Sequence, residues 1–592
     1  MGRGSHFLKF GKPGRLVRSL RGWRRVGLER LEGRELLAGD CTAAVTPPGR
    51  LTITCDGADN ELTLTESGGV FTLTGAAGTK VNSQSTPQNF SGVTDDVVID
   101  LRNGDDVLLV DGVDVGGDLR IDGGRDANRI EVRDSTIAKL LRAGAQDATI
   151  SGAGDVFGQF IKIENTDVGG DVRIRTHDSE ASSTGGNSTG NYVVLAGNQV
   201  GGSLFIMHGD AISTSDAGTS IGNDTLIHGG NSIGGKIHLH GGEAWATGNG
   251  DFVESTGNRN LIEGNTLIGG KIRIDNGKAV SIGTGHEANA NGSVTSIVGN
   301  TSIDGEITIQ NAEARGTVEG SEAAATGNFV LVYDNDAING DIDVFNEDGR
   351  GVAVGDQTRA DGNYTDIHEN GVIQGDVRIQ DQTGRASARG LASEANGNAS
   401  FVDLNTSIDG DIEIWHHQSE GRTTMDDSLS RGSWTLVELN GSLTGDVEIH
   451  ILDAFGRTTG DNSESFGAHT QVFDQAIGGR LNLRINKAES VATGVGGTSQ
   501  DSLTAVSGTT VAGDLKIKAN RGDDEILLDM VDVTGKTDIA TGQDDDYLTV
   551  LDSVFADPVE VNGGQGDDTF EDSGGNTFPA GSPELEKVEN II

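Results

Sequence analysis

Pairs of aspartate recur at a fixed spacing near the end of the chain. They are 22 residues apart and comprise Asp523 and Asp524, Asp545 and Asp546, and Asp567 and Asp568. If each pair lies on one coil of a stacked structure, carboxylates on neighbouring coils come within ~5 Å of one another. Like charges at that distance repel by about 1 kcal/mol in water and several times more in a partly buried turn. A hard cation with oxygen ligands relieves this repulsion, so we expect structural calcium at these six aspartates.

The last pair lies in a nine-residue segment, Gly563-Gly-Gln-Gly-Asp-Asp-Thr-Phe-Glu571. This segment resembles the calcium-binding nonapeptide of RTX proteins at every fixed position, which implies calcium binding at the C-terminal flank. RTX proteins chain these nonapeptides back to back, whereas the partial copies here, at 521–526 and 543–548, are one coil apart. The alternative is that the aspartates only accept hydrogen bonds from turn N–H groups. A weaker version of the pattern lies at Asp105, Asp106 and Asp126.

Two other sets of residues have cation-binding chemistry. An acidic stripe follows a repeated glycine on five consecutive repeats, at Glu306, Asp341, Asp376, Asp411 and Asp446. We expect this stripe to be a solvated polar column. Histidines gather in two groups, at His177, His208, His238 and His240, and at His416, His417 and His450. Imidazoles can bind zinc or copper, but their offsets within the repeat drift, so we do not expect the ring nitrogens to converge.

The elements that position these residues are sequence repeats. Nine asparagines are spaced by 33 or 34 residues at first and by 35 thereafter: Asn165, Asn198, Asn231, Asn265, Asn300, Asn335, Asn370, Asn405 and Asn440. An apolar residue follows each asparagine and a glycine comes two residues later, as in Ile303-Asp-Gly305. A fixed period near 35 indicates a solenoid. A column of asparagines suits stacked parallel strands and tolerates a left-handed corner. The glycine indicates a positive φ or a close approach between backbones.

The flanks of the chain use a shorter repeat. Val93, Val115 and Ile137 are 22 residues apart, as are Val511, Val533 and Phe555. The central repeats therefore carry roughly 10–13 extra residues. These extra residues are rich in Gly, Ser, Thr, Ala and Glu, as at 178–191, 280–293 and 317–327. Because they include almost no large apolar side chains, we expect surface arms and not core. The sequence predicts an all-β parallel β-helix (β-solenoid), with 22-residue rungs at the flanks and rungs of about 35 residues in the centre.

We divide the chain into five segments. They are a basic leader (1–40), an N-terminal β cap (41–92), a short-rung flank (93–167), the long-rung solenoid (168–510) and an acidic short-rung C-terminal flank (511–592). The two cysteines, Cys41 and Cys55, lie on either side of a Pro-Pro-Gly turn in the cap. In an oxidising compartment they can form a disulfide, and two free thiols are the alternative.

Charge separates the leader from the body of the protein. Residues 1–40 hold ten basic and four acidic side chains, and the remaining residues hold 34 basic and 86 acidic ones. The segment Leu31-Glu-Gly-Arg-Glu-Leu-Leu-Ala38 resembles the LEPR-XLL segment of large bacterial, planctomycete-like surface or secreted repeat proteins, with Gly33 where that family usually has Pro. The resemblance implies a secreted or cell-envelope location and no particular activity. No run of 18 apolar residues exists, so we expect no transmembrane segment. The acidic body disfavours nucleic acid as a partner.

Two classes of function fit this sequence. We expect a non-catalytic extracellular or cell-surface protein, acting in adhesion or as an envelope or matrix component, with an extracellular glycan or envelope component as partner. The alternative is a β-helix polysaccharide lyase or glycoside hydrolase, with a carboxylate pair from Asp341, Asp376, Asp411 and Asp446 at the ~5 Å that retention requires. Identical repetition argues against a unique catalytic site. Trp245, Trp415 and Trp434 could be sugar platforms, but four tryptophans in 592 residues are few.

Overall fold

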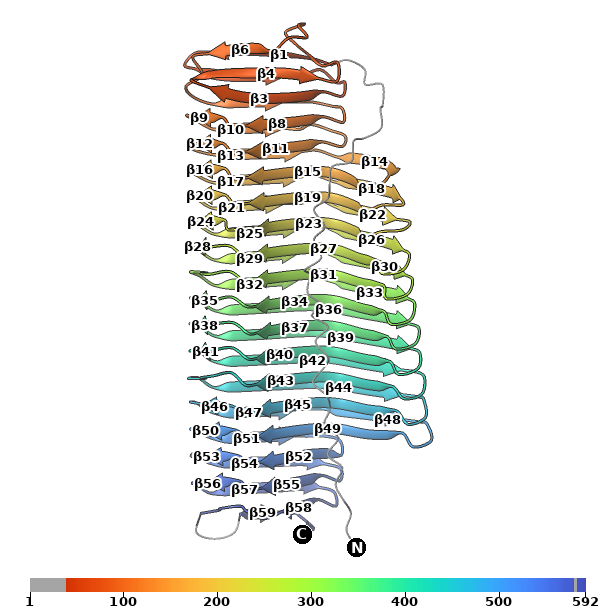
Figure 1. The fold of residues 1–592 in the computed structure, drawn as a ribbon. Coiled ribbons are helices and arrows are strands. Elements are labelled where there is room, and N and C mark those ends of the chain that lie inside the picture. Colours follow the sequence, from red (N-terminus) through yellow and green to blue (C-terminus); the bar gives the residue numbers. More distant parts are fainter. Residues whose placement is uncertain (1–38, 580–582) are drawn as a thin grey trace.

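The computed structural model describes residues 39–579 and 583–592. These residues form strands β1 to β60 and no helix (Figure 1). The strands stack in parallel coils, which confirms the predicted all-β parallel β-solenoid. Accordingly, the described residues contain no helix that is long and apolar enough to cross a membrane. The segment that resembles LEPR-XLL, at residues 31–38, lies outside the described residues.

A short coil consists of three strands around an apolar interior. In the C-terminal flank these are β51 (Leu515–Ala519), β52 (Asp524–Asp529) and β53 (Asp532–Val533). We call the long sheet that holds β51 the outer sheet and the long sheet that holds β52 the inner sheet. β51 pairs in register with β54 (Thr537–Gln543), 22 residues further along the chain. Side chains alternate between buried and exposed, so branched aliphatic residues fill the interior.

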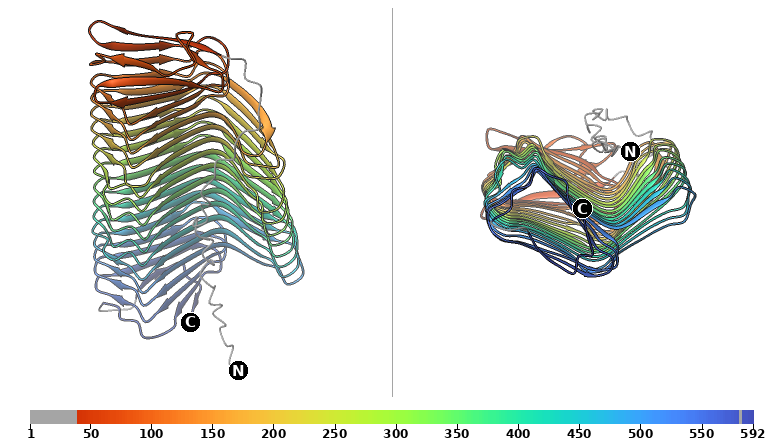
Figure 2. Two further views of the ribbon diagram at one scale, coloured as in Figure 1. Left: turned by 45° about the horizontal axis from the view of Figure 1, so that its top comes forward. Right: turned by 90° about the horizontal axis from the view of Figure 1, so that it is seen from below.

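The central coils are longer and bent. In these coils the register step is 32 to 35 residues, and between β39 and β42 it is 35. Seen along the solenoid axis, each long coil has a closed body and a second part that extends from it at an angle, which we call the wing (Figure 2). The continuous outer strands are β36 (Ile342–Val354), β39 (Val377–Arg389), β42 (Ile412–Thr423) and β44 (Val447–Thr458). The inner strands are β15 (Val156–Glu164), β19 (Ser188–Ala196), β23 (Ser220–His228), β27 (Glu254–Glu263), β31 (Asn289–Val298), β34 (Ala324–Tyr333), β37 (Arg359–His368), β40 (Glu394–Asp403), β43 (Leu429–Glu438), β45 (Glu464–Phe473) and β49 (Thr498–Ser507).

The wing corrects the expectation of surface arms. The extra residues at 178–191, 280–293 and 317–327 form strands that pair coil to coil and extend both long sheets. Their interior is a separate cluster of small side chains, in which Ala290 and Ala325 are fully buried. Alanine, serine and glycine allow two sheets to pack closely, so this layer needs no large apolar residue. In the wing, the absence of large side chains therefore indicates a thin core between two closely packed sheets.

The predicted asparagine ladder runs through the long coils. Each side-chain amide donates to the side-chain oxygen of the next asparagine at 2.8–3.0 Å, in the order Asn198, Asn231, Asn265, Asn300, Asn335, Asn370, Asn405 and Asn440. The same oxygen also accepts the backbone N–H of the preceding asparagine, as between Asn300 and Asn335 at 3.1 Å. All eight side chains are buried. The ladder therefore provides buried partners for both backbone and side-chain groups at this corner.

The assignment of Asn165 to this ladder is wrong by one residue. Thr166 occupies the ladder position, because its backbone N–H donates to Asn198 Oδ1 at 3.0 Å. Asn165 is exposed and has a left-handed backbone, with φ of 48°. In later coils too, the left-handed residue precedes the ladder asparagine, as Asp334 (φ of 55°) precedes Asn335. The asparagine is therefore selected for its amide, and the corner is made by its neighbour.

The repeated glycine is explained by close approach between coils. A Cβ atom on Gly375 would lie 2.6 Å from the carbonyl carbon of Gly340 and 2.7 Å from the nitrogen of Asp341. The φ of Gly375 is not in the positive range, so the left-handed alternative does not apply here. Any larger residue would therefore push two coils apart at this corner.

The N-terminal end of the solenoid is covered by antiparallel strands. β1 (Asp40–Thr46) pairs with β2 (Arg50–Thr54), and a disulfide between Cys41 and Cys55 joins their outer ends. The next antiparallel pair is β3 (Glu61–Ser67) and β4 (Val70–Ala76). β2 and β3 in turn pair in parallel with the first coil. The cap thus satisfies the sheet edges that a bare first coil would expose.

Removing one ladder amide should loosen the coils on either side. In Asn335→Ala, the N–H and amide groups of Asn300 lose their acceptor in a buried site. We expect the free energy of local opening to fall by about 3 kcal/mol, since a buried unsatisfied group costs ~1–3 kcal/mol. Hydrogen exchange across β34 and β37 measures this opening. The matched control is Asn339→Ala, an exposed asparagine of the same coil that donates to Asp304. An equal effect in both variants would contradict the role of the ladder.

Candidate functional site

The six predicted calcium-site aspartates lie in two columns at the C-terminal flank. Asp523, Asp545 and Asp567 are exposed, and the first two accept hydrogen bonds from the backbone of the following coil. The N–H of Asp545 donates to Asp523 Oδ1 at 3.1 Å, and the N–H of Asp567 donates to Asp545 Oδ1 at 2.9 Å. In this outer column the aspartates therefore cap turn N–H groups, as the alternative interpretation supposed.

The inner column, Asp524, Asp546 and Asp568, is buried, with 1–3% of each residue exposed. One oxygen of the carboxyl groups of Asp546 and Asp568 accepts a backbone N–H of the preceding coil, at 2.9 Å and 3.0 Å. The hydroxyl of Ser502 donates to Asp524 Oδ1 at 2.5 Å. The second oxygen, Oδ2, is buried without a hydrogen-bond partner in all three residues.

This inner column continues a second polar ladder of the long coils. There, Asn328 donates to Asn363 and Asn363 to Asn398 at 2.9–3.0 Å. The ladder leads in register through Ser433, Ala468 and Ser502 to Asp524. An asparagine passes a hydrogen bond along because it has both a donor and an acceptor, whereas an ionised aspartate has only acceptors. Replacing asparagine by aspartate therefore places an uncompensated oxygen in a buried column.

The N-terminal flank repeats this arrangement at Asp106. Its Oδ1 accepts from the backbone of Asn60 at 2.7 Å, and its Oδ2 is buried without a partner. Burial raises the pKa of Asp106 to about 7. At the other end, burial raises the pKa of Asp524 to about 9 and that of Asp546 to about 7, and neighbouring carboxylates add to both shifts. Each of these groups is therefore stabilised either by a proton or by a bound cation.

The donor set at the C-terminal flank fits a hard cation. Asp524, Asp546 and Asp568 would hold calcium through their uncommitted oxygens, with the outer column supplying further negative charge. In the described residues, groups of three whose ligand atoms all lie within 4.8 Å occur elsewhere, at His286, Glu287 and Glu322 and at Asp366, His368 and Asp403. Calcium at the flank would consequently use the oxygens of separate coils and not one preformed cluster.

The acidic stripe has a structural role. Asp341, Asp376 and Asp411 each accept the backbone N–H one coil further on, at 2.7–2.9 Å. Arg378 forms ion pairs with Asp341 and Asp376, and Arg480 forms one with Asp446. The carboxylates that the sequence offered as a catalytic pair are thus engaged with backbone N–H groups and arginines.

The two histidine groups do not converge on one point. His208 is buried between the hydroxyls of Thr176 and Thr225, at 2.9 and 2.8 Å. Burial lowers the pKa of its imidazole to about 3. His416 is fully buried between Ser400 and Ser433, at 2.8 and 2.6 Å. Both histidines therefore belong to interior hydrogen-bond networks, away from solvent.

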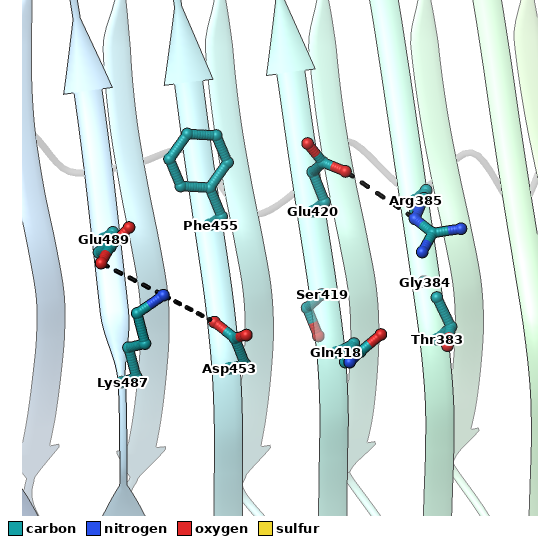
Figure 3. Close-up of a pocket in the computed structure, with 10 residues that line it drawn as sticks. All are labelled: Thr383, Gly384, Arg385, Gln418, Ser419, Glu420, Asp453, Phe455, Lys487 and Glu489. Atoms are coloured by element: carbon teal, nitrogen blue, oxygen red, sulfur yellow. Dashed lines mark ion pairs between the residues drawn. The ribbon is translucent and has the colours of Figure 1, made fainter.

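A shallow pocket lies on the outer sheet where body and wing meet (Figure 3). Arg385 and Glu420 face each other there at 3.9 Å. Lys487 lies between Asp453 and Glu489, at 3.5 and 3.2 Å. Because these charged groups already pair with one another along the surface, the pocket offers no uncommitted charge to a ligand.

A set of aromatic residues on the other side of the bend was missed by the sequence analysis. The outward side chains of the inner sheet form what we call the inner face. Here the rings of Phe329 and Tyr364 are parallel, with centroids 5.1 Å apart. Tyr364 contacts Phe401 at 5.3 Å, and Phe401 meets Trp434 edge to face at 4.7 Å. Phe401 and Trp434 are buried, at 6–7% exposed, whereas Phe329 and Tyr364 are half-buried. Residues 329, 364, 399 and 434 are 35 apart, so aligning the repeats would have revealed most of this column.

Charged residues of the wing lie against these rings. Arg431 stacks over Trp434 at 4.3 Å and pairs with Glu394 at 2.5 Å. Arg359 lies over Tyr364 at 5.2 Å and pairs with Asp361 at 2.7 Å. Burial raises the pKa of Asp361 above its ordinary value although Arg359 opposes the shift. The inner face thus combines aromatic surfaces with partly desolvated ion pairs, and its residues differ from coil to coil.

Comparison with protein-family models, with curated proteins and with solved structures finds no match. The fold alone therefore defines the class of this protein, a parallel β-solenoid with a winged central section.

The buried aspartates predict that the C-terminal flank loses stability as the pH rises in the absence of divalent cations. Their folded pKa values lie above the ordinary ~3.9. Stability is therefore complete below about pH 4 and falls as the pH rises through 7 and 9. Hydrogen exchange of β52, β55 (Tyr547–Leu551) and β58 (Thr569–Asp572) in EDTA, from pH 5 to 9, measures this loss.

The variant Asp546→Asn tests the cause. Because an amide has no charge to bury, we expect the step near pH 7 to disappear and added calcium to protect the flank less. The exposed Asp545→Asn serves as the control and should keep the step. A flat pH profile in the parent protein would refute the assignment.

Proposed function

We propose that this protein is a non-catalytic, secreted or cell-surface β-solenoid that acts in adhesion or as an envelope or matrix component. In this proposal the inner face binds an extracellular glycan or envelope polymer, and calcium stabilises the acidic C-terminal flank. The observation that carries the proposal is the aromatic and arginine-rich inner face, where the repeat departs from its own pattern.

The inner face suits an extended polymer. The aromatic column follows the stacking direction over four consecutive coils, from Phe329 to Trp434. Aromatic rings offer flat apolar surfaces at little entropic cost, and tyrosine and arginine add hydrogen-bonding groups at their edges. Repeated weak contacts along such a line strengthen one another through avidity. A neutral or cation-bridged glycan matches this surface best, because the protein has a net charge of −46.

Three further observations support the location and the absence of catalysis. The LEPR-XLL resemblance of residues 31–38 favours export. The disulfide between Cys41 and Cys55 is a bond that persists in oxidising compartments. The stripe aspartates, including Asp341 and Asp376, cap backbone groups and so are poor candidates for a catalytic pair.

Calcium is supported by the buried, unpartnered oxygens of Asp524, Asp546 and Asp568. A bound cation would replace the proton that these groups otherwise need at neutral pH. Its role in the proposal is structural, because the flank is separate from the aromatic column.

The glycan proposal is tested with a panel of bacterial and algal polysaccharides and the full-length protein in calcium. We expect at least one polysaccharide to bind without release of reducing ends. Phe329→Ala and Tyr364→Ala should each weaken this binding roughly tenfold, as for aromatic residues at the centre of an interface. Phe345→Ala, a half-buried phenylalanine on the outer sheet, should leave the affinity unchanged.

Two results would count against the proposal. Equal loss of binding in all three variants would place the contact elsewhere or indicate general instability. Release of reducing ends would identify a polysaccharide-cleaving enzyme.

A further inference from the structure

Three residues that could bind a metal ion, Asp366, His368 and Asp403, lie together on the inner face beside the aromatic column. Asp366 and His368 are two residues apart on β37 and so point to the same side of the sheet. Asp403 on β40 is the cross-strand neighbour of His368. The candidate ligand atoms of the three side chains all lie within 4.8 Å of one another. Two ligands of a tetrahedral zinc ion lie about 3.3 Å apart, so only small side-chain rotations are needed.

One edge of the cluster is an ion pair. Asp366 Oδ1 and His368 Nδ1 lie 2.9 Å apart, and neither atom has a geometrically aligned hydrogen-bond partner. The side chains of Asp366 and His368 are 16% and 12% exposed, so the cluster lies just beneath the surface of the inner face.

Neighbouring residues hold the cluster in place. Tyr364 Oη donates to Asp366 Oδ2 at 3.2 Å, which leaves Oδ1 directed at His368. The ring of Tyr333 stacks on that of His368, with centroids 5.1 Å apart and planes within 6°. Outer contacts that orient a ligand in this way are typical of metal sites.

The local charge is negative. Asp366, Asp403 and Glu438 bring three carboxyl groups around one histidine. Glu438 is the cross-strand neighbour of Asp403 on the next coil and can supply another oxygen. A divalent cation would therefore offset repulsion between carboxylates that lie in a partly desolvated place.

The same column elsewhere lacks this chemistry. His228 occupies the position of His368 four coils earlier in the inner sheet, with Ala196 and Glu263 as its cross-strand neighbours. The residue two positions before it is Leu226. Three candidate ligand residues thus come together at His368 and not at its counterpart His228.

We propose that Asp366, His368 and Asp403 form a binding site for a divalent transition metal of the zinc, cobalt or manganese type. One imidazole nitrogen with carboxylate oxygens favours such ions over calcium, which prefers oxygen alone. This proposal does not rest on glycan binding, although the metal would lie beside the aromatic column.

The test uses the full-length protein and Co²⁺ as a spectroscopic probe, with Zn²⁺ titration calorimetry for affinity. We expect a visible Co²⁺ absorption that Zn²⁺ displaces. His368→Gln and Asp403→Asn should remove it or weaken binding at least tenfold. Tyr364→Phe, which removes only the outer hydrogen bond to Asp366, should weaken binding by a smaller factor.

The matched control is His228→Gln, which should leave the Co²⁺ absorption intact. Hydrogen exchange of β37 and β40 confirms that each variant keeps its fold. Absence of a Co²⁺ signal in the parent protein, or an unchanged signal in His368→Gln, would overturn the proposal. The second outcome would place the ion elsewhere, for example at the exposed group of His286 and Glu322.

Discussion

In-register stacking is the constraint on which this structure depends. Each coil pairs in parallel with its neighbours, so every side chain lies beside the side chain at the same position one coil away. An aliphatic residue satisfies this condition by packing on another aliphatic residue. A polar residue in a repeated interior position satisfies it by bonding to a copy of itself, which asparagine can do because it has both a donor and an acceptor. The two asparagine ladders follow directly from this requirement.

The same constraint makes exceptions chemically informative. An aspartate in an asparagine ladder leaves an oxygen without a donor, as at Asp524 and Asp106. A histidine with one carboxylate on its own strand and another on the next strand forms a small cluster of candidate metal ligands, as at His368. In both cases the neighbours along the column, and not the surrounding pocket, create the unusual electrostatic environment. In this fold, a candidate site therefore arises where one residue in a stacked column differs in type from its neighbours on the adjacent coils.

The coil could be predicted from the sequence because the spacing of repeated residues is visible in one sequence, without an alignment. The 35-residue step of Asn300 and its successors fixed the register, and the 22-residue step fixed the short coils. The wing was misjudged because alanine and serine were counted as surface residues, although small residues suffice where two sheets lie close together. The aspartate columns could be placed from spacing alone. The burial of Asp524 beside the exposed Asp523 could not be predicted from spacing, because it depends on which way each side chain points at the turn.

The inner face escaped prediction for a related reason. Phe329, Tyr364 and Trp434 share a position in the repeat but not a residue type, so a search for identical residues passes over them. His368 and Asp403 likewise become neighbours only when β37 and β40 are placed in register. Candidate functional positions in a repeat protein are thus the equivalent positions of aligned coils at which the residue type changes from coil to coil.

The bent cross-section has a mechanical consequence. A flat stack of strands bends easily in the direction in which it is thin. A stack with an angled cross-section resists bending in both directions perpendicular to its long axis. Body and wing are joined by continuous strands such as β39 and β42, so no hinge separates the two limbs of the angle (Figure 2). The long coils of the central section therefore resist bending of the solenoid axis, and the short coils without a wing at its two ends bend more easily.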